Sequence, residues 1–158
     1  MSPTVRPAPL PPGSALQTRI SPGDFVDCYA VASDLPARRA AEIIAEFPGW
    51  VRALVALRGM IVAPFGLRTN GPSAKDKIGE FPVESETDAE VIAGFNDRHL
   101  DFRISVQARN GRVSLATWVR RHNLGGRLYL AAILPFHVAI VRNALARVAR
   151  RSGTAIKG

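Results

Sequence analysis

The clearest pattern in the chain is a strict alternation of apolar and polar residues from His99 to Ala108. Such a period of two predicts a half-buried β-strand. The pair Asn110-Gly111 follows, and these two residues best tolerate the positive φ angles of a type I′ hairpin turn. A second strand paired to the first is therefore expected after Gly111. The apolar positions of the first strand are Leu100, Phe102, Ile104, Val106 and Ala108.

This turn fixes the register of the hairpin, because it places Arg109 opposite Arg112. The apolar side then opposes Phe102 to Val119, Ile104 to Thr117 and Val106 to Leu115. The polar side opposes Asp101 to Arg120, Arg103 to Trp118 and His99 to His122. An ion pair, a cation–π contact and a histidine pair are expected from these three juxtapositions.

The segments before the hairpin alternate between strand and helix signals. A polar cap at Ser33-Asp34 and the nearby Pro36 predict the start of a helix. Pro48-Gly49 separates the first helix from a second one. The expected elements are a strand over 25–31, helices over 37–47 and 50–62, a long loop over 63–79, and strands over 81–87 and 91–95.

The last long segment, residues 127–151, is predicted to form one helix with an apolar arc at 100° per residue. Pro135 lies on the outer side of this helix, where it bends the rod without entering the core. The fold class is therefore α+β: an antiparallel sheet with a helix pair after the first strand and a long C-terminal helix packed on the sheet. The inward arc consists of Leu130, Ile133, Leu134, His137, Val138, Ile140, Val141, Ala144, Leu145 and Val148.

Composition and short sequence signals predict the domain boundaries and the cellular location. Residues 1–23 hold six prolines and are expected to be an extended or disordered lead-in, 24–151 a single domain and 152–158 a flexible tail. Cys28 is the lone cysteine, and the first thirty residues lack a secretory signal pattern, so a cytoplasmic location is expected. The most apolar run, 128–141, is shorter than the roughly 20 residues of a spanning helix, so no transmembrane segment is predicted.

Charge is distributed unevenly along the chain. Residues 1–101 carry 10 Lys/Arg and 13 Asp/Glu, whereas residues 102–158 carry 11 Lys/Arg and no acid. An anionic partner for the basic half, either a membrane or a nucleic acid, is one interpretation. The other is internal neutralisation of arginines by the acids between Asp76 and Glu90. Few aromatic residues interleave with the arginines, which disfavours base stacking.

Several short segments resemble a known family. They are Pro48-Gly49-Trp50-Val51, Pro64-Phe65-Gly66-Leu67, His99-Leu100-Asp101-Phe102-Arg103, and Gly126-Arg127-Leu128-Tyr129 with Pro135-Phe136-His137. Over about residues 24–150 the chain is similar to the bacterial domain-of-unknown-function 2867 family, which has no established activity. The resemblance implies kinship with the helix-grip (Bet v 1/START-like, SRPBCC) superfamily, in which the sheet and the long helix enclose an apolar cavity. The chain departs from that superfamily in showing four predicted strands after the helix pair, where six are usual.

Two groups of residues carry candidate chemistry. The polar face of the hairpin combines an acid, cations and two histidines suited to acid–base work, or it is a solvated face with cross-strand pairs. His137 points inward from an apolar arc, either as a ligand contact or as a hydrogen-bonded core histidine. Trp50 and the 63–79 loop are expected to border the same pocket, with the loop as a lid. The candidate ligand-binding residues are Trp50, Phe65, His99, Asp101, Arg103, Trp118, Arg120, His122 and His137.

Three classes of function remain open on this basis. The leading hypothesis is a module that binds an apolar or amphipathic small molecule between the sheet and the C-terminal helix, with an arginine contacting an anionic group. The alternative is a small cyclase, dehydratase or hydrolase that uses His99, Asp101 or His137. Association through the basic C-terminal half is the third. The sequence contains no nucleophile motif, cofactor motif or metal-ligand spacing. Cys28 is interpreted as a core residue. The sequence does not determine the oligomeric state.

Overall fold

The computed structural model describes residues 4–62, 75–79, 81–97 and 99–155. It is an α+β fold with one open sheet of seven strands in the order β1-β2-β7-β6-β5-β4-β3, every neighbouring pair being antiparallel. The strands are β1 (Arg6–Pro7), β2 (Phe25–Ala32), β3 (Lys77–Ile78), β4 (Phe81–Glu86), β5 (Glu90–Asn96), β6 (Leu100–Arg109) and β7 (Arg112–Arg121). The helices are the 3₁₀ helix η1 (Ala15–Thr18), α1 (Ala37–Ile44), α2 (Gly49–Val62) and α3 (Leu124–Ala155).

The predicted hairpin is confirmed. Asn110 and Gly111 have φ angles of 55° and 71°, as a type I′ turn requires. Arg109 pairs with Arg112, and all the expected oppositions from Val106 to Asp101 follow from that register. After the helix pair the structure has five strands, one more than expected, because the two-residue strand β3 pairs with β4 inside the segment interpreted as a loop.

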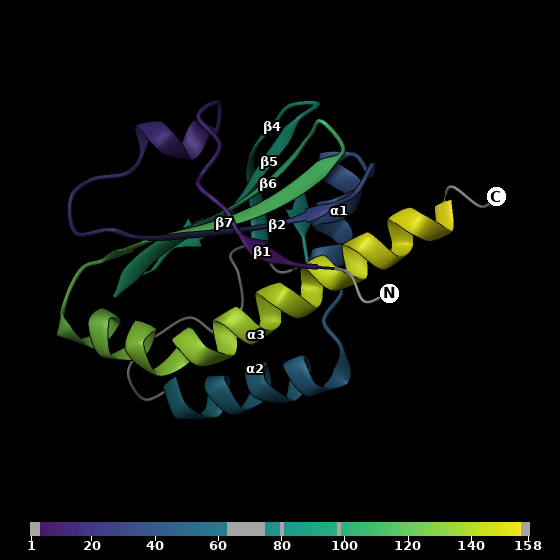
Figure 1. The fold of residues 1–158 in the computed structure, drawn as a ribbon. Coiled ribbons are helices and arrows are strands. Elements are labelled where there is room, and N and C mark those ends of the chain that lie inside the picture. The colour runs from purple at the N-terminus through teal and green to yellow at the C-terminus, as the bar shows by residue number, and fades with distance from the viewer. Residues whose placement is uncertain (1–3, 63–74, 80, 98, 156–158) are drawn as a thin grey trace.

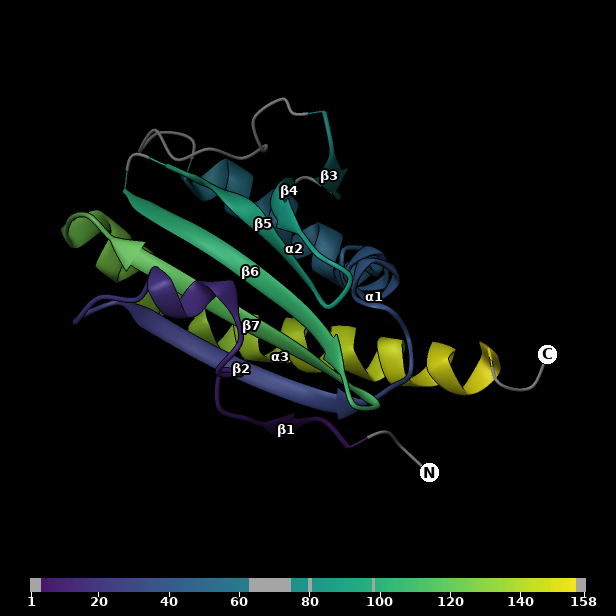
Figure 2. The same ribbon diagram turned by 90° about the horizontal axis from the view of Figure 1, so that it is seen from above.

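The three α-helices lie on one side of the sheet (Figures 1 and 2). Helix α3 lies over β2 and β7, whereas α1 lies over β5 and β6, so the apolar face of β6 packs beneath α3 only in part. Leu100 shares a cluster with Leu130 of α3, and Val106 shares the main cluster with residues of both α1 and α3. The second half of α3 is the more deeply buried. Val141, Ala144, Leu145 and Val148 are each no more than 5% exposed and pack against α1 and the sheet.

Helix α3 is a single helix of 32 residues with Pro135 inside it. It runs past the expected end at Arg151. Ser152, placed in a flexible tail by the sequence, is buried and its hydroxyl accepts the Asp34 N–H at 3.0 Å. The start of α3 is fixed by Gly126, where a side chain would meet the His99 carbonyl oxygen at 2.2 Å.

The other side of the sheet is covered by residues 8–24 between β1 and β2, called here the N-terminal segment (Figure 1). Here the structure differs from the expected lead-in over 1–23. Ala8 donates its N–H to the Cys28 carbonyl at 2.9 Å, and Leu16 in η1 is completely buried. Proline blocks regular ladders, but an extended backbone can still lie across a sheet and insert an apolar side chain. Leu16 therefore packs in a second cluster with Cys28, Ile92, Ala116 and Trp118.

Helix α1 begins where it was expected, but its capping differs from the expectation. Pro36 occupies the N-cap position and makes no side-chain capping bond. The Ser33 hydroxyl instead accepts the Leu35 N–H at 3.2 Å, ahead of the helix. The helix starts at Ala37 because the fixed φ of Pro36 precedes it, as the sequence indicated.

Candidate functional site

The polar face of the hairpin does not form an open site, because the N-terminal segment covers much of it. Trp118 is 1% exposed and donates its indole N–H to Asp24 at 2.9 Å. Two guanidinium groups lie over its ring, those of Arg19 at 5.3 Å and Arg120 at 5.2 Å. The expected cation–π partner Arg103 is replaced by these two arginines, because the N-terminal segment brings Arg19 to the ring.

Asp24 is the acid that Arg120 contacts, at 3.1 Å, in place of the expected Asp101. Its side chain is 6% exposed. Burial alone raises the pKa of the Asp24 carboxyl, but hydrogen bonds from Arg120, the Ser21 backbone and Trp118 outweigh it, so the pKa is lowered below 3.8. Asp24 therefore fastens the N-terminal segment to β7.

Replacing Asp24 by asparagine should destabilise the protein in a pH-dependent way. A carboxyl whose pKa is lowered by folding contributes stability above its unfolded pKa and loses it as the pH falls through the folded pKa. The variant should thus be less stable than wild type at neutral pH, and the difference should shrink as the pH falls below 3.8 and vanish once the pH is below the lowered pKa of Asp24 in the folded protein. Urea unfolding across that range measures it. A difference that stays constant with pH would mean that charge at Asp24 is irrelevant.

The remaining residues of that face are held in separate contacts. Arg103 is buried, with its Nε 3.2 Å from Glu84 but not aligned for a hydrogen bond, and it donates through Nη1 to the Phe102 carbonyl at 2.7 Å. His122 lies 2.9 Å from Asp101, whereas His99 lies 3.2 Å from the Asn123 side chain, which accepts the Gly126 N–H at the start of α3. His99 and His122 meet through the backbone, where the His122 N–H donates to the His99 carbonyl.

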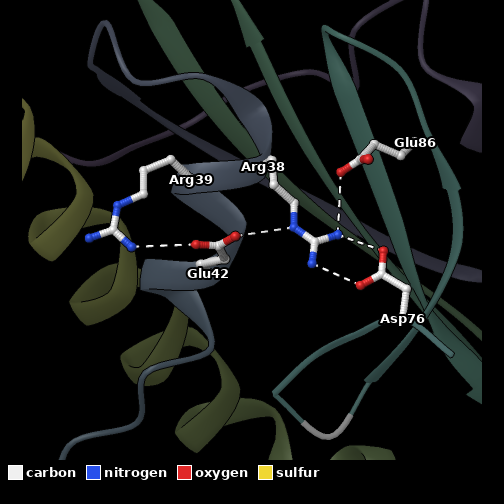
Figure 3. Close-up of polar contacts among 5 residues, drawn as sticks. All are labelled: Arg38, Arg39, Glu42, Asp76 and Glu86. Atoms are coloured by element: carbon white, nitrogen blue, oxygen red, sulfur yellow. Dashed lines mark hydrogen bonds and ion pairs between the residues drawn. The ribbon is translucent and has the colours of Figure 1, made fainter. Parts of the chain in front are cut away.

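Acids between Asp76 and Glu90 pair with arginines, but Arg38 belongs to the first half of the chain, so this network does not neutralise the basic half. Figure 3 shows Arg38 of α1 holding Asp76 through two bonds of 2.8 Å, with Glu86 at 3.3 Å and Glu42 at 3.2 Å. The hydrogen bonds from Arg38 lower the pKa of the Asp76 carboxyl. This network connects α1 to β4 and to the residue that precedes β3, so it is structural.

A different polar cluster lies on the helix-facing side of the sheet. His137 of α3 hydrogen-bonds through Nε2 to Asp27 Oδ2 of β2 at 2.9 Å, and both side chains are slightly under one-fifth exposed. Thr117 of β7 is the cross-strand partner of Asp27. Directly opposed residues project to the same face, so Asp27, Thr117 and His137 form one cluster, called here the helix-facing site.

The helix-facing site contains two buried polar atoms, Asp27 Oδ1 and Thr117 Oγ1, that have no hydrogen-bond partner among the described residues. Its neighbours on the sheet are apolar. The next row of residues across the same face consists of Phe25, Val119, Phe102 and Phe95. The Phe102 ring lies 4.8 Å from Phe95 and 5.5 Å from Phe81, and the Phe25 ring meets the His137 imidazole edge-on at 6.3 Å.

Of the three residues in this site, the sequence singled out His137 alone. Asp27 and Thr117 were not predicted, although the sequence around each contains a feature that could have identified it. Asp27 occupies an inward position of an otherwise apolar strand, between Phe25 and Tyr29, where a charge needs a partner. Thr117 stands opposite Ile104 in the predicted register, as the one hydroxyl on the apolar side of that pairing.

Trp50 and Phe65 were expected in the same pocket as His137. The chain just before Trp50 is attached to the end of α3, since Arg151 pairs with Glu46 at 2.7 Å and Arg147 donates to the Glu46 carbonyl. Arg147 is ten residues beyond His137, or about 15 Å along a helix. The chain before α2 is thus attached to a different part of α3 from the part that carries His137, and Phe65 lies outside the described residues.

Cys28 is buried and is not activated as a thiol. Burial, together with the neighbouring Asp27 carboxylate, raises the pKa of the Cys28 thiol to about 11, so it stays protonated at neutral pH. Within the described part of the chain, no group of three or more histidine, cysteine or acidic side chains could hold a metal ion.

Comparison with known families agrees with the segments quoted above. The model of one family matches residues 20–144, and its description is protein of unknown function (DUF2867). The chain belongs to the DUF2867 family. Comparisons with curated proteins and with solved structures gave no significant match. Membership of DUF2867 carries no activity with it, so function is argued from the site.

Proposed function

We propose that this DUF2867 protein binds an amphipathic small molecule between the sheet and α3, with the polar end of the molecule at the helix-facing site. The observation that carries the proposal is the pair of buried, unpartnered atoms Asp27 Oδ1 and Thr117 Oγ1. An unsatisfied buried polar group costs about 1–3 kcal/mol, so two adjacent ones favour a ligand that pairs with them. The hydrogen bond of His137 to Asp27 satisfies only one carboxylate oxygen.

The chemistry of the site favours a hydrogen-bond donor at the polar end. An ionised carboxylate only accepts, whereas a threonine hydroxyl donates and accepts. A hydroxyl or an amine on the ligand could therefore pair with both Asp27 and Thr117. This proposal replaces the expected arginine–anion contact, because a ligand carboxylate would face the Asp27 carboxylate.

The apolar part of the ligand is proposed to lie along the row of Phe25, Val119, Phe102 and Phe95. Phe25, Phe102 and Phe95 are only half-buried, so contact with a ligand would remove further apolar surface from water. A site between an antiparallel sheet and a long C-terminal helix is also what kinship with the helix-grip superfamily implies. The order of strand, helix pair, sheet and long helix supports that kinship.

A matched series of ligands tests the donor requirement: 1-decanol, decylamine and decanoate share one apolar chain and differ in the polar end. Titration calorimetry should show binding of the alcohol and the amine, and at least about tenfold weaker binding of the acid, because like charges at close range are strongly disfavoured. Equal affinity for all three would show that the polar end does not reach Asp27.

Thr117→Val should stabilise the free protein by about 1 kcal/mol while weakening the binding of 1-decanol. The substitution keeps the shape of the side chain and removes an unsatisfied hydroxyl. Thr87→Val is the matched control, because the Thr87 hydroxyl accepts the Ala89 and Glu90 N–H groups, and its loss should destabilise. Urea unfolding and calorimetry measure both effects. A destabilised Thr117→Val with unchanged affinity would sink the assignment.

An acid–base enzyme is the second candidate, favoured by one contact. A histidine whose ring is oriented by a carboxylate at 2.9 Å is the arrangement that proton-transfer sites use. A compound that binds should then be recovered chemically altered after incubation with wild type, but intact with His137→Leu, as mass spectrometry can show. Recovery of the unaltered compound from both wild type and His137→Leu would argue against an enzyme and favour binding alone.

A further inference from the structure

The outer face of the first half of α3 is apolar and exposed. Leu124, Leu128 and Phe136 are 69%, 64% and 52% exposed. A helix at a protein surface normally carries polar residues on its solvent side, and an apolar solvent side requires another explanation. The exposed residues on this arc, called here the α3 outer stripe, are Leu124, Leu128, Ala131, Ala132, Pro135, Phe136 and Ala139.

Helix α2 adds exposed apolar side chains on the same side of the molecule. Trp50, Leu57 and Met60 are 45%, 52% and 76% exposed. Figures 1 and 2 show α2 and α3 both on the side of the sheet away from η1. The apolar exposure is therefore spread over two helices of one molecular face.

The charges carried by the two helices themselves are of one sign. The sequence contains no acid between 47 and 75, which includes all of α2, or anywhere after Asp101, which includes all of α3. Arg127 and Arg142 bracket most of the α3 outer stripe, and Arg52 lies beside Trp50 in sequence; all three are exposed. A surface that is both apolar and cationic complements the interface of an anionic lipid bilayer.

We propose that the α3 outer stripe, together with the exposed face of α2, lies in the interfacial region of an anionic lipid membrane. This inference goes beyond small-molecule binding and does not depend on it. A second copy of the chain fits less well, because two such faces would bring arginines against arginines with no acid on either helix.

The helix is proposed to lie on the membrane and not to cross it. By length and hydropathy α3 could span a bilayer within Leu124–Ser152, where an 18-residue stretch reaches a mean hydropathy of 1.6, although the sequence predicted no such segment from the shorter run 128–141. The inward face of the same helix, however, is part of the core through Val141, Leu145 and Val148. Crossing would pull those side chains out of the core, whereas lying flat uses only the exposed stripe.

Vesicle flotation of the full chain tests this proposal. Wild type should float with vesicles of phosphatidylcholine mixed with phosphatidylglycerol, and Leu128→Glu/Phe136→Glu should bind at least about tenfold more weakly, because it places charge in the interface. Ile20→Glu is the matched control, since Ile20 is 37% exposed on the N-terminal segment across the sheet, and it should bind like wild type. Arg127→Gln should lose about fivefold on anionic vesicles only.

Three results would overturn the proposal. The first is no flotation of wild type, and the second is equal flotation of wild type and the double variant, which would mean purely electrostatic adsorption. The third is a dimer in size-exclusion chromatography with light scattering that the double variant abolishes without lipid, which would assign the stripe to a second copy. Circular dichroism melting should be unchanged in the double variant, because both side chains are more than half exposed.

Discussion

Replacing Leu16 by alanine should lower the free energy of unfolding by about 3 kcal/mol. Leu16 is 0% exposed and packs against Cys28, Ile92, Ala116 and Trp118 on the side of the sheet away from the helices. The alanine variant loses the buried leucine side chain and leaves a cavity that a sheet surface cannot readily close. Equilibrium unfolding in urea measures the loss.

Ile20→Ala is the matched control for that prediction. Ile20 belongs to the same segment but is 37% exposed, so its truncation should change stability far less. If Leu16→Ala costs less than about 1 kcal/mol, the N-terminal segment contributes little to the core and the sheet is covered on one side only.

Replacing Glu90 by alanine should have an effect of similar size, about 3 kcal/mol. Glu90 is 8% exposed and accepts the hydroxyls of Ser14 and Ser105, each at 2.5 Å, and the Ala15 N–H at 2.9 Å. Alanine would leave these three donors without their acceptor, two of them on the buried residues Ser14 and Ser105. It would also release η1, because two of the donors belong to its first turn.

Glu86→Ala is the corresponding control. Glu86 is an acid on the neighbouring strand with a side chain 43% exposed, and it contacts Arg38 at 3.3 Å. Exposed ion pairs contribute little, so this variant should unfold close to wild type. Equal losses for Glu86→Ala and Glu90→Ala would show that burial of the Glu90 carboxylate does not anchor the N-terminal segment.

The N-terminal segment also shows where sequence reasoning reaches its limit. The register of the hairpin was predictable to the residue. The alternation in β6 and the Asn110-Gly111 turn are both local signals, and they specify the same register. The packing of Leu16 is not local. A single leucine among prolines has no period, and its burial depends on Glu90, which lies more than seventy positions away and bonds Ser14 and Ala15.

The candidate site was predictable in part for the same reason. His137 stood out because it interrupts an apolar arc on one helix. Its partner Asp27 lies 110 positions earlier, and sheet order alone brings β2 beside β7 beneath α3. The polar face of the hairpin had the predicted register, but Trp118 and Arg120 contact Asp24, which lies outside the hairpin.

The ligand site between the sheet and α3 is tested most directly by methyl NMR during titration with 1-decanol. Thr117 and Ile104 project to the helix-facing side of the sheet, whereas Ala116 and Ile92 belong to the cluster on the opposite side. We predict that the methyl resonances of Thr117 and Ile104 shift with the ligand while those of Ala116 and Ile92 stay in place. Shifts confined to Ala116 and Ile92 would place the ligand beneath the N-terminal segment and contradict the proposed site.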